Sequence, residues 1–281
     1  MQDYFEGWYL KTQSDSQTLA VIPAVHQTGG LRTCSIQVIT DENAWAVSFP
    51  FDVFRQRKKG IRIGENVFGE QGVRLDINER DLRVKGKLAF GLLSPLKYDI
   101  MGPFAVVPFM ECRHSVFSMR HTVNETVVVN GKRYVFDNSA GYWEGDRGRS
   151  FPKEYLWTQC IFPEGSIMLS VADIPLAGMH FTGIIGVVLW RGRQYRLATY
   201  LGAKAIRIQN GSVRIVQGDM ELEARLLESA GKALKAPTDG NMVRTIHESV
   251  TCRAYYRFQK RGGTLFEFET GKASFEYEYS R

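Results

Sequence analysis

Apolar and polar residues alternate with a period of two at many places along the chain. Residues 264–270 read Thr-Leu-Phe-Glu-Phe-Glu-Thr, and residues 273–279 repeat the pattern. This alternation is typical of β-strands that turn one face to a core and the other to water. We therefore predict a hairpin here, with Gly271 and Lys272 at its turn, and a further strand at residues 220–226.

Turn signals separate many of the extended segments. Asn130-Gly131 and Asn210-Gly211 are the strongest, since Asn-Gly favours a tight hairpin turn, and Arg191-Gly192 occupies a similar position. Further strand–turn–strand patterns cover residues 18–39, 44–54, 61–77 and 82–90. No segment has the pattern of an amphipathic helix longer than about three turns. The best helical candidate, residues 226–235, contains a glycine and is followed by a proline.

Many short strands joined by tight turns are typical of β-barrels and β-sandwiches. A barrel of eight strands takes roughly 140 residues, and this chain has 281 residues. Residues 5–12 and 154–160 also resemble each other, because each sets a tryptophan in an aromatic strand after a charged residue. We predict an all-β fold with little helix, made of two consecutive antiparallel β-barrels at residues 1–135 and 136–281. One extended double-barrel sandwich is the alternative.

Composition and charge exclude several classes of protein. The chain has 44% hydrophobic and 23% charged residues, as ordinary globular proteins do. Its net charge is +6, but lysines and arginines are scattered except at residues 55–59, which argues against a nucleic-acid groove. A peripheral contact with a membrane or an anionic ligand stays open. The apolar tracts at residues 88–110 and 174–190 contain prolines and polar groups, so no transmembrane segment is predicted.

Cysteines and histidines show no metal-binding spacing. The four cysteines form no Cys-x-x-Cys pair, and the five histidines form no His-x-x-x-His pair, so we predict no metal site. Isolated cysteines without a recognisable export signal predict a cytoplasmic protein. Phosphate-loop, dinucleotide-binding and Gly-x-Ser-x-Gly motifs are missing, so nothing indicates a kinase, dehydrogenase or hydrolase.

Residues 138–159 combine large aromatic side chains with charged ones. The aromatic residues include Tyr142, Trp143 and Trp157, the acids are Glu144 and Asp146, and the cations include Arg147 and Lys153. The rings are costly to leave in water, and the acids are costly to bury without partners. We interpret the segment as a loop at the mouth of a lined cavity, where Gly145 and Gly148 let the backbone turn sharply. A surface loop with ordinary ion pairs is the alternative.

Two further segments place polar groups beside apolar ones. Glu6 stands between Phe5 and Trp8, where a carboxylate is either kept neutral by burial or held ionised by a cation. It is a candidate acid, or else a strand-edge residue that faces water. Glu111 and His114 follow a long apolar run, and strand alternation places them on opposite faces.

Several motifs resemble those of the tocopherol cyclase family. Residues 5–11 (Phe-Glu-Gly-Trp-Tyr-Leu-Lys) are similar to the family's opening motif. Residues 142–146 (Tyr-Trp-Glu-Gly-Asp), together with 150–153 and 155–160, are similar to its central motif. The proline-rich segment at residues 101–114 is similar to segments in bacterial members. The likeness spans almost the whole chain in the same order.

This resemblance implies a lipocalin-like (calycin) architecture of two barrel halves and a chemistry that protonates a prenyl double bond. A phenol oxygen then traps the carbocation and closes a ring, or water traps it in a hydration. The substrate would be a prenyl-chain lipid or quinol in a hydrophobic cavity, with no cofactor and no metal. Such a site needs a carboxylic acid as proton donor and aromatic faces beside the carbocation. The candidate catalytic residues are Asp146, Glu144 and Glu6, and the candidate ligand-binding residues are Trp8, Tyr142, Trp143, Trp157, Arg147, Lys153, Glu111 and His114.

A non-catalytic lipocalin-like binder of a hydrophobic small molecule is the alternative. The two hypotheses differ in the surroundings of Asp146 and Glu144. An enzyme would hold one of these acids inside the cavity, whereas a carrier would show both in exposed or saturated ion pairs. Arg147 and Lys153 must point away if either acid is to stay neutral. A structural or interaction protein with a filled core is a third hypothesis.

Overall fold

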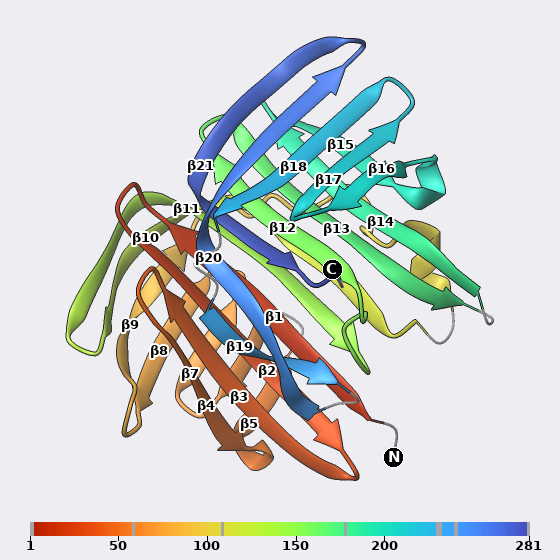
Figure 1. Cartoon of the computed structure of the whole chain (residues 1–281). Coiled ribbons are helices and arrows are strands. Elements are labelled where there is room, and N and C mark those ends of the chain that lie inside the picture. The colour runs from red at the N-terminus through yellow and green to blue at the C-terminus, as the bar shows by residue number, and fades with distance from the viewer. Residues whose placement is uncertain are drawn as a thin grey trace. The chain divides into compact units, whose positions relative to one another are not determined.

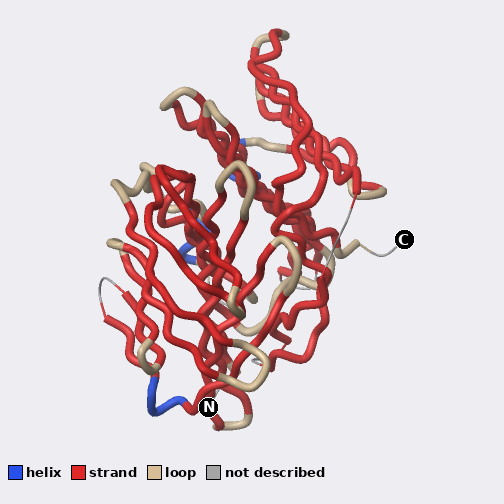
Figure 2. The backbone as a smooth tube through the Cα atoms, turned by 90° about the vertical axis from the view of Figure 1, so that its left-hand side faces the viewer, coloured by secondary structure: helices blue, strands red, loops and turns tan. Residues whose placement is uncertain are grey.

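A computed structural model of the chain describes residues 3–57, 60–107, 110–176, 179–228, 232–238 and 241–279. Strand makes up most of this described part, as Figure 2 shows. Helix is limited there to three 3₁₀ segments: η1 (Phe51–Val53), η2 (Gly102–Val106) and η3 (Thr199–Leu201). The predicted all-β fold with little helix is confirmed. No helix in the described ranges is long and apolar enough to cross a membrane.

The first sheet has eleven antiparallel strands in the order β4-β3-β2-β1-β11-β10-β9-β8-β7-β6-β5. They are β1 (Tyr4–Gln13), β2 (Thr18–Thr28), β3 (Leu31–Thr40), β4 (Ala44–Pro50), β5 (Phe54–Arg57), β6 (Gly60–Ile63), β7 (Asn66–Gly69), β8 (Gly72–Asn78), β9 (Arg83–Phe90), β10 (Cys112–Val129) and β11 (Lys132–Gly148). The two edge strands, β4 and β5, are joined by η1 alone. Because three residues span only a short distance, the edges lie close together and the sheet curls into a barrel-like form.

The second sheet has ten strands, in the order β15-β14-β13-β12-β21-β20-β18-β17-β16, with β19 paired to β20. They are β12 (Tyr155–Phe162), β13 (Gly165–Leu176), β14 (Met179–Trp190), β15 (Arg193–Ala198), β16 (Lys204–Gln209), β17 (Ser212–Gln217), β18 (Met220–Glu228), β19 (Lys232–Thr238), β20 (Asn241–Lys260) and β21 (Gly263–Tyr277). Its edge strands, β15 and β16, are joined through η3, so this sheet curls in the same way (Figure 1).

The two sheets repeat one pattern of connections. In each, the opening strand (β1 or β12) lies between the strand that follows it and a strand from late in the sheet (β11 or β21). This repeat explains the similarity of residues 5–12 and 154–160, which fall on the two opening strands. The architecture is a double calycin-like barrel, as predicted.

The chain divides into two compact units. The first contains Met1–Lys97, Met110–Ser150 and Lys235–Arg244, and the second contains Tyr98–Phe109, Phe151–Leu234 and Thr245–Arg281. Each unit has its own apolar core, which includes Leu10, Ile36 and Val123 in the first and Leu169, Val188 and Phe258 in the second. The joint that we predict near residue 135 lies inside β11.

Three of the predicted turns are confirmed, and the predicted hairpin near the C-terminus is wrong. Asn130-Gly131, Asn210-Gly211 and Arg191-Gly192 do connect adjacent strands, and all six residues have positive φ, as tight hairpin turns require. The hairpin that we predict at Gly271 and Lys272 is wrong, because β21 continues through both residues. Its two halves pair with the same strand, β20, instead of with each other, and a shift in register between Cys252 and Ala254 absorbs the irregularity.

Candidate functional site

The segment that we predict as a loop, residues 138–159, is mostly strand, and only residues 149–154 lie between two strands. Residues 138–148 form the second half of β11, between β1 and β10. Gly145 and Gly148 do not turn the chain. A Cβ atom at Gly145 would lie 2.9 Å from the carbonyl oxygen of Gly7, and one at Gly148 would lie 2.0 Å from that of Glu111. The glycines therefore allow neighbouring backbone to approach closely.

Strand alternation sends the functional side chains of β11 to two faces of the sheet. Trp143 packs in the apolar core of the first unit, so this face of the strand is the inner one. Tyr142, Glu144 and Asp146 occupy the alternate positions and share the opposite face. His114 on β10 is directly opposite Asp146 in the strand register.

His114 lies between two carboxylates on this opposite face. Its Nδ1 is 2.8 Å from Asp146 Oδ1, in a hydrogen bond. Its Nε2 is 3.0 Å from Glu144 Oε2, an ion-pair contact whose direction is not that of a hydrogen bond. The Tyr142 hydroxyl donates a hydrogen bond to the same Glu144 oxygen. We call Tyr142, Glu144, His114 and Asp146 the His114 network.

The network holds a charged imidazolium away from water. Burial by itself lowers the pKa of His114, but the charges of Asp146 and Glu144, helped by hydrogen bonding, outweigh it and raise the pKa well above 6.5. Burial, with the nearby charge of Glu144, also raises the pKa of Tyr142, which keeps the phenol neutral and able to donate. The raised pKa favours the protonated form of the His114 ring at neutral pH.

Two more groups join this face. The Cys112 thiol donates to Asp146 Oδ1 at 3.5 Å, and burial together with the charge of Asp146 raises its pKa. Lys11 of β1 is fully buried and pairs in register with Tyr142. Both residues lie in segments that resemble the family's motifs, but neither was among the predicted site residues, because their neighbours on this face depend on the cross-strand register.

The same side chains could offer ligands to a metal ion. One ligand atom from each of His114, Glu144 and Asp146 lies within 4.8 Å of the others. A nitrogen and two carboxylate oxygens suit a divalent cation in kind. However, a protonated imidazole cannot coordinate, so a metal would have to displace a proton that both carboxylates stabilise. Metal binding by these three side chains would therefore release a proton.

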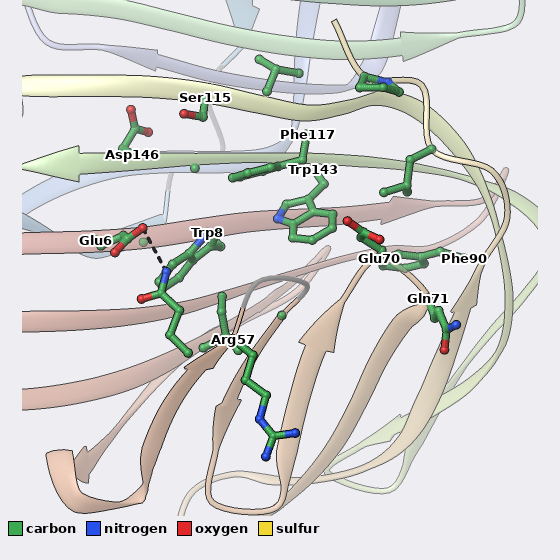
Figure 3. A pocket seen from close by; sticks show the side chains of 18 of the residues that line it. Glu6, Trp8, Arg57, Glu70, Gln71, Phe90, Ser115, Phe117, Trp143 and Asp146 are labelled. Atoms are coloured by element: carbon green, nitrogen blue, oxygen red, sulfur yellow. Dashed lines mark hydrogen bonds between the residues drawn. The ribbon is translucent and has the colours of Figure 1, made fainter. Parts of the chain in front are cut away.

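A pocket of about 980 Å³ opens in the first unit. The residues that line it include Glu6, Trp8, Gln56, Arg57, Glu70, Phe90, Leu93, Phe117, Trp143, Asp146 and Arg147. Figure 3 shows many of these side chains, with the indoles of Trp8 and Trp143 and the ring of Phe117 among them. Its size and apolar walls suit a ligand of drug or lipid dimensions.

Aromatic rings form much of the wall. The Phe117 ring packs on the Trp143 indole with their centroids 4.8 Å apart, and the Trp8 ring stacks on Phe54 at 6.5 Å. Phe117 reaches this position because the register of β10 against β11 shifts between Val116 and Ser118. The extra residue of this β-bulge turns its ring toward Trp143. The sequence does not signal a bulge, and Phe117 was not among the predicted site residues.

Polar groups also line the pocket. Glu6 accepts a hydrogen bond from the Tyr4 hydroxyl at 3.0 Å and a longer one from Gln56 Nε2 at 3.5 Å. Arg147 is exposed and is opposite Glu6 in the strand register, and no ion pair links it to Glu144 or Asp146. The cation beside the two acids in sequence therefore points away from the His114 network.

Asp146 belongs to both the pocket and the network. It lines the pocket, and its Oδ1 contacts His114. No hydrogen-bond partner of its Oδ2 occurs in the part of the chain that the structure describes. The side chain is partly accessible, at 24% of its surface, whereas that of His114 is 7% accessible.

The other predicted site residues lie elsewhere. Trp157 and Lys153 belong to the second unit. Glu111 precedes β10, and its carbonyl oxygen accepts the backbone N–H of Arg149 at 2.8 Å. It is neither part of the network nor among the residues that line the pocket.

The sequence of the chain was compared with those of known proteins, to test its resemblance to the tocopherol cyclase family. A maize (Zea mays) protein named tocopherol cyclase, chloroplastic, is 26% identical over 161 residues. The chain is similar to tocopherol cyclase. The match covers 53% of this chain and only 34% of the maize protein, so it spans about a third of that relative. No protein-family model matches the chain.

Solved structures share the fold. Kievitone hydratase from Nectria haematococca is 10% identical with a TM-score of 0.58, and the match covers 98% of this chain and 89% of that one. CghA in complex with Sch210972 is 9% identical with a TM-score of 0.63, over 99% and 89% of the two chains. A Nitrosomonas europaea protein designated AttH is 10% identical with a TM-score of 0.58, over 100% and 93%. At these identities the likeness shows the fold alone.

Proposed function

We propose that this chain catalyses the proton-initiated cyclisation or hydration of a prenyl-chain lipid or quinol that binds in the pocket of the first unit. One observation carries the proposal: Asp146 lines the apolar pocket and is hydrogen-bonded to a buried imidazolium. A proton donor is thereby connected to a cavity that can hold an alkene.

The His114 network supplies and recovers the proton. Transfer from His114 Nδ1 to Asp146, across 2.8 Å, gives a neutral carboxylic acid at the pocket. This acid protonates the double bond of the prenyl chain and leaves a tertiary carbocation. A phenol oxygen of the ligand then attacks the cation, or a water molecule does, and the proton that this oxygen loses passes to Asp146 and from there back to His114 Nδ1. The network ends each cycle in its starting state.

Glu144 and Tyr142 hold the imidazolium in place. Glu144 is almost fully buried, and its charge stabilises the positive ring from the side opposite Asp146. The Tyr142 hydroxyl donates to Glu144 and so orients this carboxylate. In this proposal Glu144 is a positioning residue and Asp146 is the catalytic acid.

The aromatic wall suits a carbocation. The faces of Trp8, Trp143 and Phe117 attract a positive charge through their ring electrons, and their bulk limits the entry of stray water. The names of two similar proteins agree with the proposed chemistry, since tocopherol cyclase names a cyclisation and kievitone hydratase names a hydration.

A carrier of a hydrophobic molecule is the second candidate. Both acids of the central motif contact one imidazolium, which is the paired state that a non-catalytic binder would have. A carrier would use the pocket in the same way and leave the network as structural support. Turnover separates the two functions.

The experiment is incubation of the purified chain with farnesylhydroquinone, followed by mass spectrometry of the extracted products. We expect a cyclised product, or a product heavier by one water, and a loss of about 100-fold or more in Asp146→Asn with the ligand still bound. Asp173→Asn is the matched control, because Asp173 also pairs with a histidine, His180 Nδ1 at 2.6 Å, in an exposed position. Bound ligand without turnover in the wild-type chain would favour the carrier.

A further inference from the structure

Four large apolar side chains are exposed on neighbouring segments of the second unit. Tyr98 precedes η2, Val106 and Leu201 end η2 and η3, and Ile206 lies in β16. Their exposed fractions range from 49% for Leu201 to 84% for Val106. Only five other large apolar side chains are exposed in the described ranges, and these lie on other segments. Single exposed apolar residues are ordinary on a protein surface, but a group of them marks a contact site.

Side chains of β15 and η3 hold these segments together. The Arg196 guanidinium of β15 donates to the carbonyl oxygen of Tyr98 at 2.6 Å. The Tyr200 ring of η3 packs against Phe104 of η2, with the ring centroids 5.7 Å apart. Leu201 follows Tyr200 directly, and η3 leads into β16. The exposed side chains therefore come from segments that lie next to one another.

The same segments are basic. Residues 174–218, from the end of β13 through β17, contain six lysines and arginines and no aspartate or glutamate. Arg196, Lys204 and Arg207 lie on β15 and β16, and none of the three pairs with a carboxylate in the described part of the chain. The segment before η2 adds one acid, Asp99, whose carboxylate accepts the backbone N–H of Met101 at 2.8 Å. The exposed apolar side chains thus stand in a region of net positive charge.

Apolar and basic side chains occur together on this surface. We call Tyr98, Val106, Leu201, Lys204, Ile206 and Arg207 the η3 surface.

This combination fits a membrane better than a protein partner. Apolar side chains that project singly can each enter the boundary between lipid headgroups and acyl chains, whereas a protein partner needs a continuous complementary face. Lysine and arginine beside them are attracted to the phosphates of anionic headgroups. Tyr98 also suits this boundary, because its ring is apolar and its hydroxyl can stay in contact with water.

We infer that the η3 surface docks the chain reversibly on a membrane that contains anionic lipids. Tyr98, Val106 and Leu201 enter the headgroup boundary, while Lys204 and Arg207 contact lipid phosphates. A few apolar side chains and two cations give weak binding, so the docked chain can leave again. This inference does not rest on the proposed function, because the η3 surface belongs to the second unit and the pocket to the first.

Vesicle flotation tests the basic part of the surface. It compares vesicles of phosphatidylcholine alone with vesicles of phosphatidylcholine and phosphatidylglycerol in equal parts. We expect the wild-type chain to bind the anionic vesicles more strongly, and the binding to fall as salt is raised. Lys204→Gln should weaken it about 5-fold, the usual effect of one basic side chain at an anionic surface. Lys85→Gln is the matched control and should bind as the wild type does, because Lys85 is 82% accessible but lies in the first unit.

The apolar part is tested in the same assay. Leu201→Ser should weaken binding to anionic vesicles about 3-fold or more, since it removes an apolar side chain from the lipid boundary. Leu31→Ser is its matched control, because Leu31 is also exposed but lies on β3 of the first unit. It should leave binding unchanged. Equal weakening by a test variant and its control would overturn the assignment of docking to the η3 surface.

Hydrogen exchange of the wild-type chain needs no variant. Anionic vesicles should slow amide exchange in residues 98–106 and 199–207 and leave residues 31–50 unchanged. No binding to anionic vesicles, or protection confined to other segments, would overturn this inference and leave the proposed function untouched. Binding to soluble polyglutamate without binding to vesicles would overturn it in favour of an acidic protein partner. Vesicle binding by a chain that turns over no ligand would support this inference while the proposed function fails.

Discussion

The two faces of β11 use the same stretch of chain in opposite ways. On one face Trp143 lines a pocket and keeps its N–H unpaired. On the other, Glu144 and Asp146 are held by His114, with Tyr142 and Cys112 as further donors. One face borders the pocket, and the other face holds two carboxylates around one histidine.

Under the proposed function, this difference separates ligand binding from proton storage within one strand. A proton is stored best where water is excluded and where fixed partners stabilise the charged form. A ligand binds best where a rigid apolar wall leaves a few polar groups free. Because successive residues of a strand face opposite sides, both environments are built within a few residues, and Asp146 near the end of β11 connects them.

Among these substitutions, replacing His114 should lower the free energy of unfolding the most. His114→Ala leaves Glu144, with 4% of its side-chain surface accessible, beside Asp146 without a cation between them. Breaking a buried pair in this way costs about 3–5 kcal/mol. We expect a loss of that size in the free energy of unfolding, measured by urea denaturation.

The control for this prediction is the exposed His180–Asp173 pair, in which the His180 side chain is 64% accessible. His180→Ala should cost about 1 kcal/mol or less. A loss of similar size in both variants would show that the His114 network is no better shielded from water than a surface ion pair.

The buried histidines should change stability with pH in opposite directions, because their surroundings shift their pKa values in opposite directions. Burial lowers the pKa of His121 to about 4, and that of His26 also to about 4, whereas the pKa of His114 is raised well above 6.5. His114 contributes stability that is fully present below pH 6.5 and is lost as pH rises through its folded pKa. His121 and His26 act in the other direction, because the unfolded chain binds their protons between pH 6.5 and 4 and the folded chain does not.

The wild-type chain should lose stability as the pH rises above 6.5, and His114→Gln should remove this loss. It should also lose stability as the pH falls below 6.5, and His121→Gln should make that loss smaller. Each slope approaches about 1.4 kcal/mol per pH unit where one proton is fully exchanged. Urea denaturation at a series of pH values measures both. If His114→Gln left the alkaline side of the profile unchanged, the imidazolium would not be stabilised in the folded chain.

We expect the smallest change in stability and turnover from a substitution of Glu6, which lines the pocket. Glu6 is half-buried, and a glutamine there keeps an oxygen that can accept from Tyr4 and Gln56. Glu6→Gln should change the free energy of unfolding by about 0.5 kcal/mol or less and leave turnover within a few-fold of the wild type. Complete loss of turnover in this variant, with ligand still bound, would move the acid from the His114 network to Glu6.

The sequence predicts much of the fold and part of the site. Period-two alternation and glycine turns indicate the strands, and residues 142–146 contain three of the four side chains of the His114 network. The two glycines at 145 and 148 suggested a loop, which concealed the alternation that puts Glu144 and Asp146 on one face. The contact of Asp146 with His114 depends on the register of β10 against β11, and the position of Phe117 depends on a bulge. Neither can be derived from spacing along the chain.

The most direct test of the account is turnover of farnesylhydroquinone in D₂O, with the position of deuterium in the product determined by NMR. Protonation of the prenyl double bond by the His114 network predicts one deuterium per product molecule, on the alkene carbon that gains the proton, and almost no product in Asp146→Asn. A product formed without deuterium at that carbon, or formed equally well by Asp146→Asn, would contradict the account.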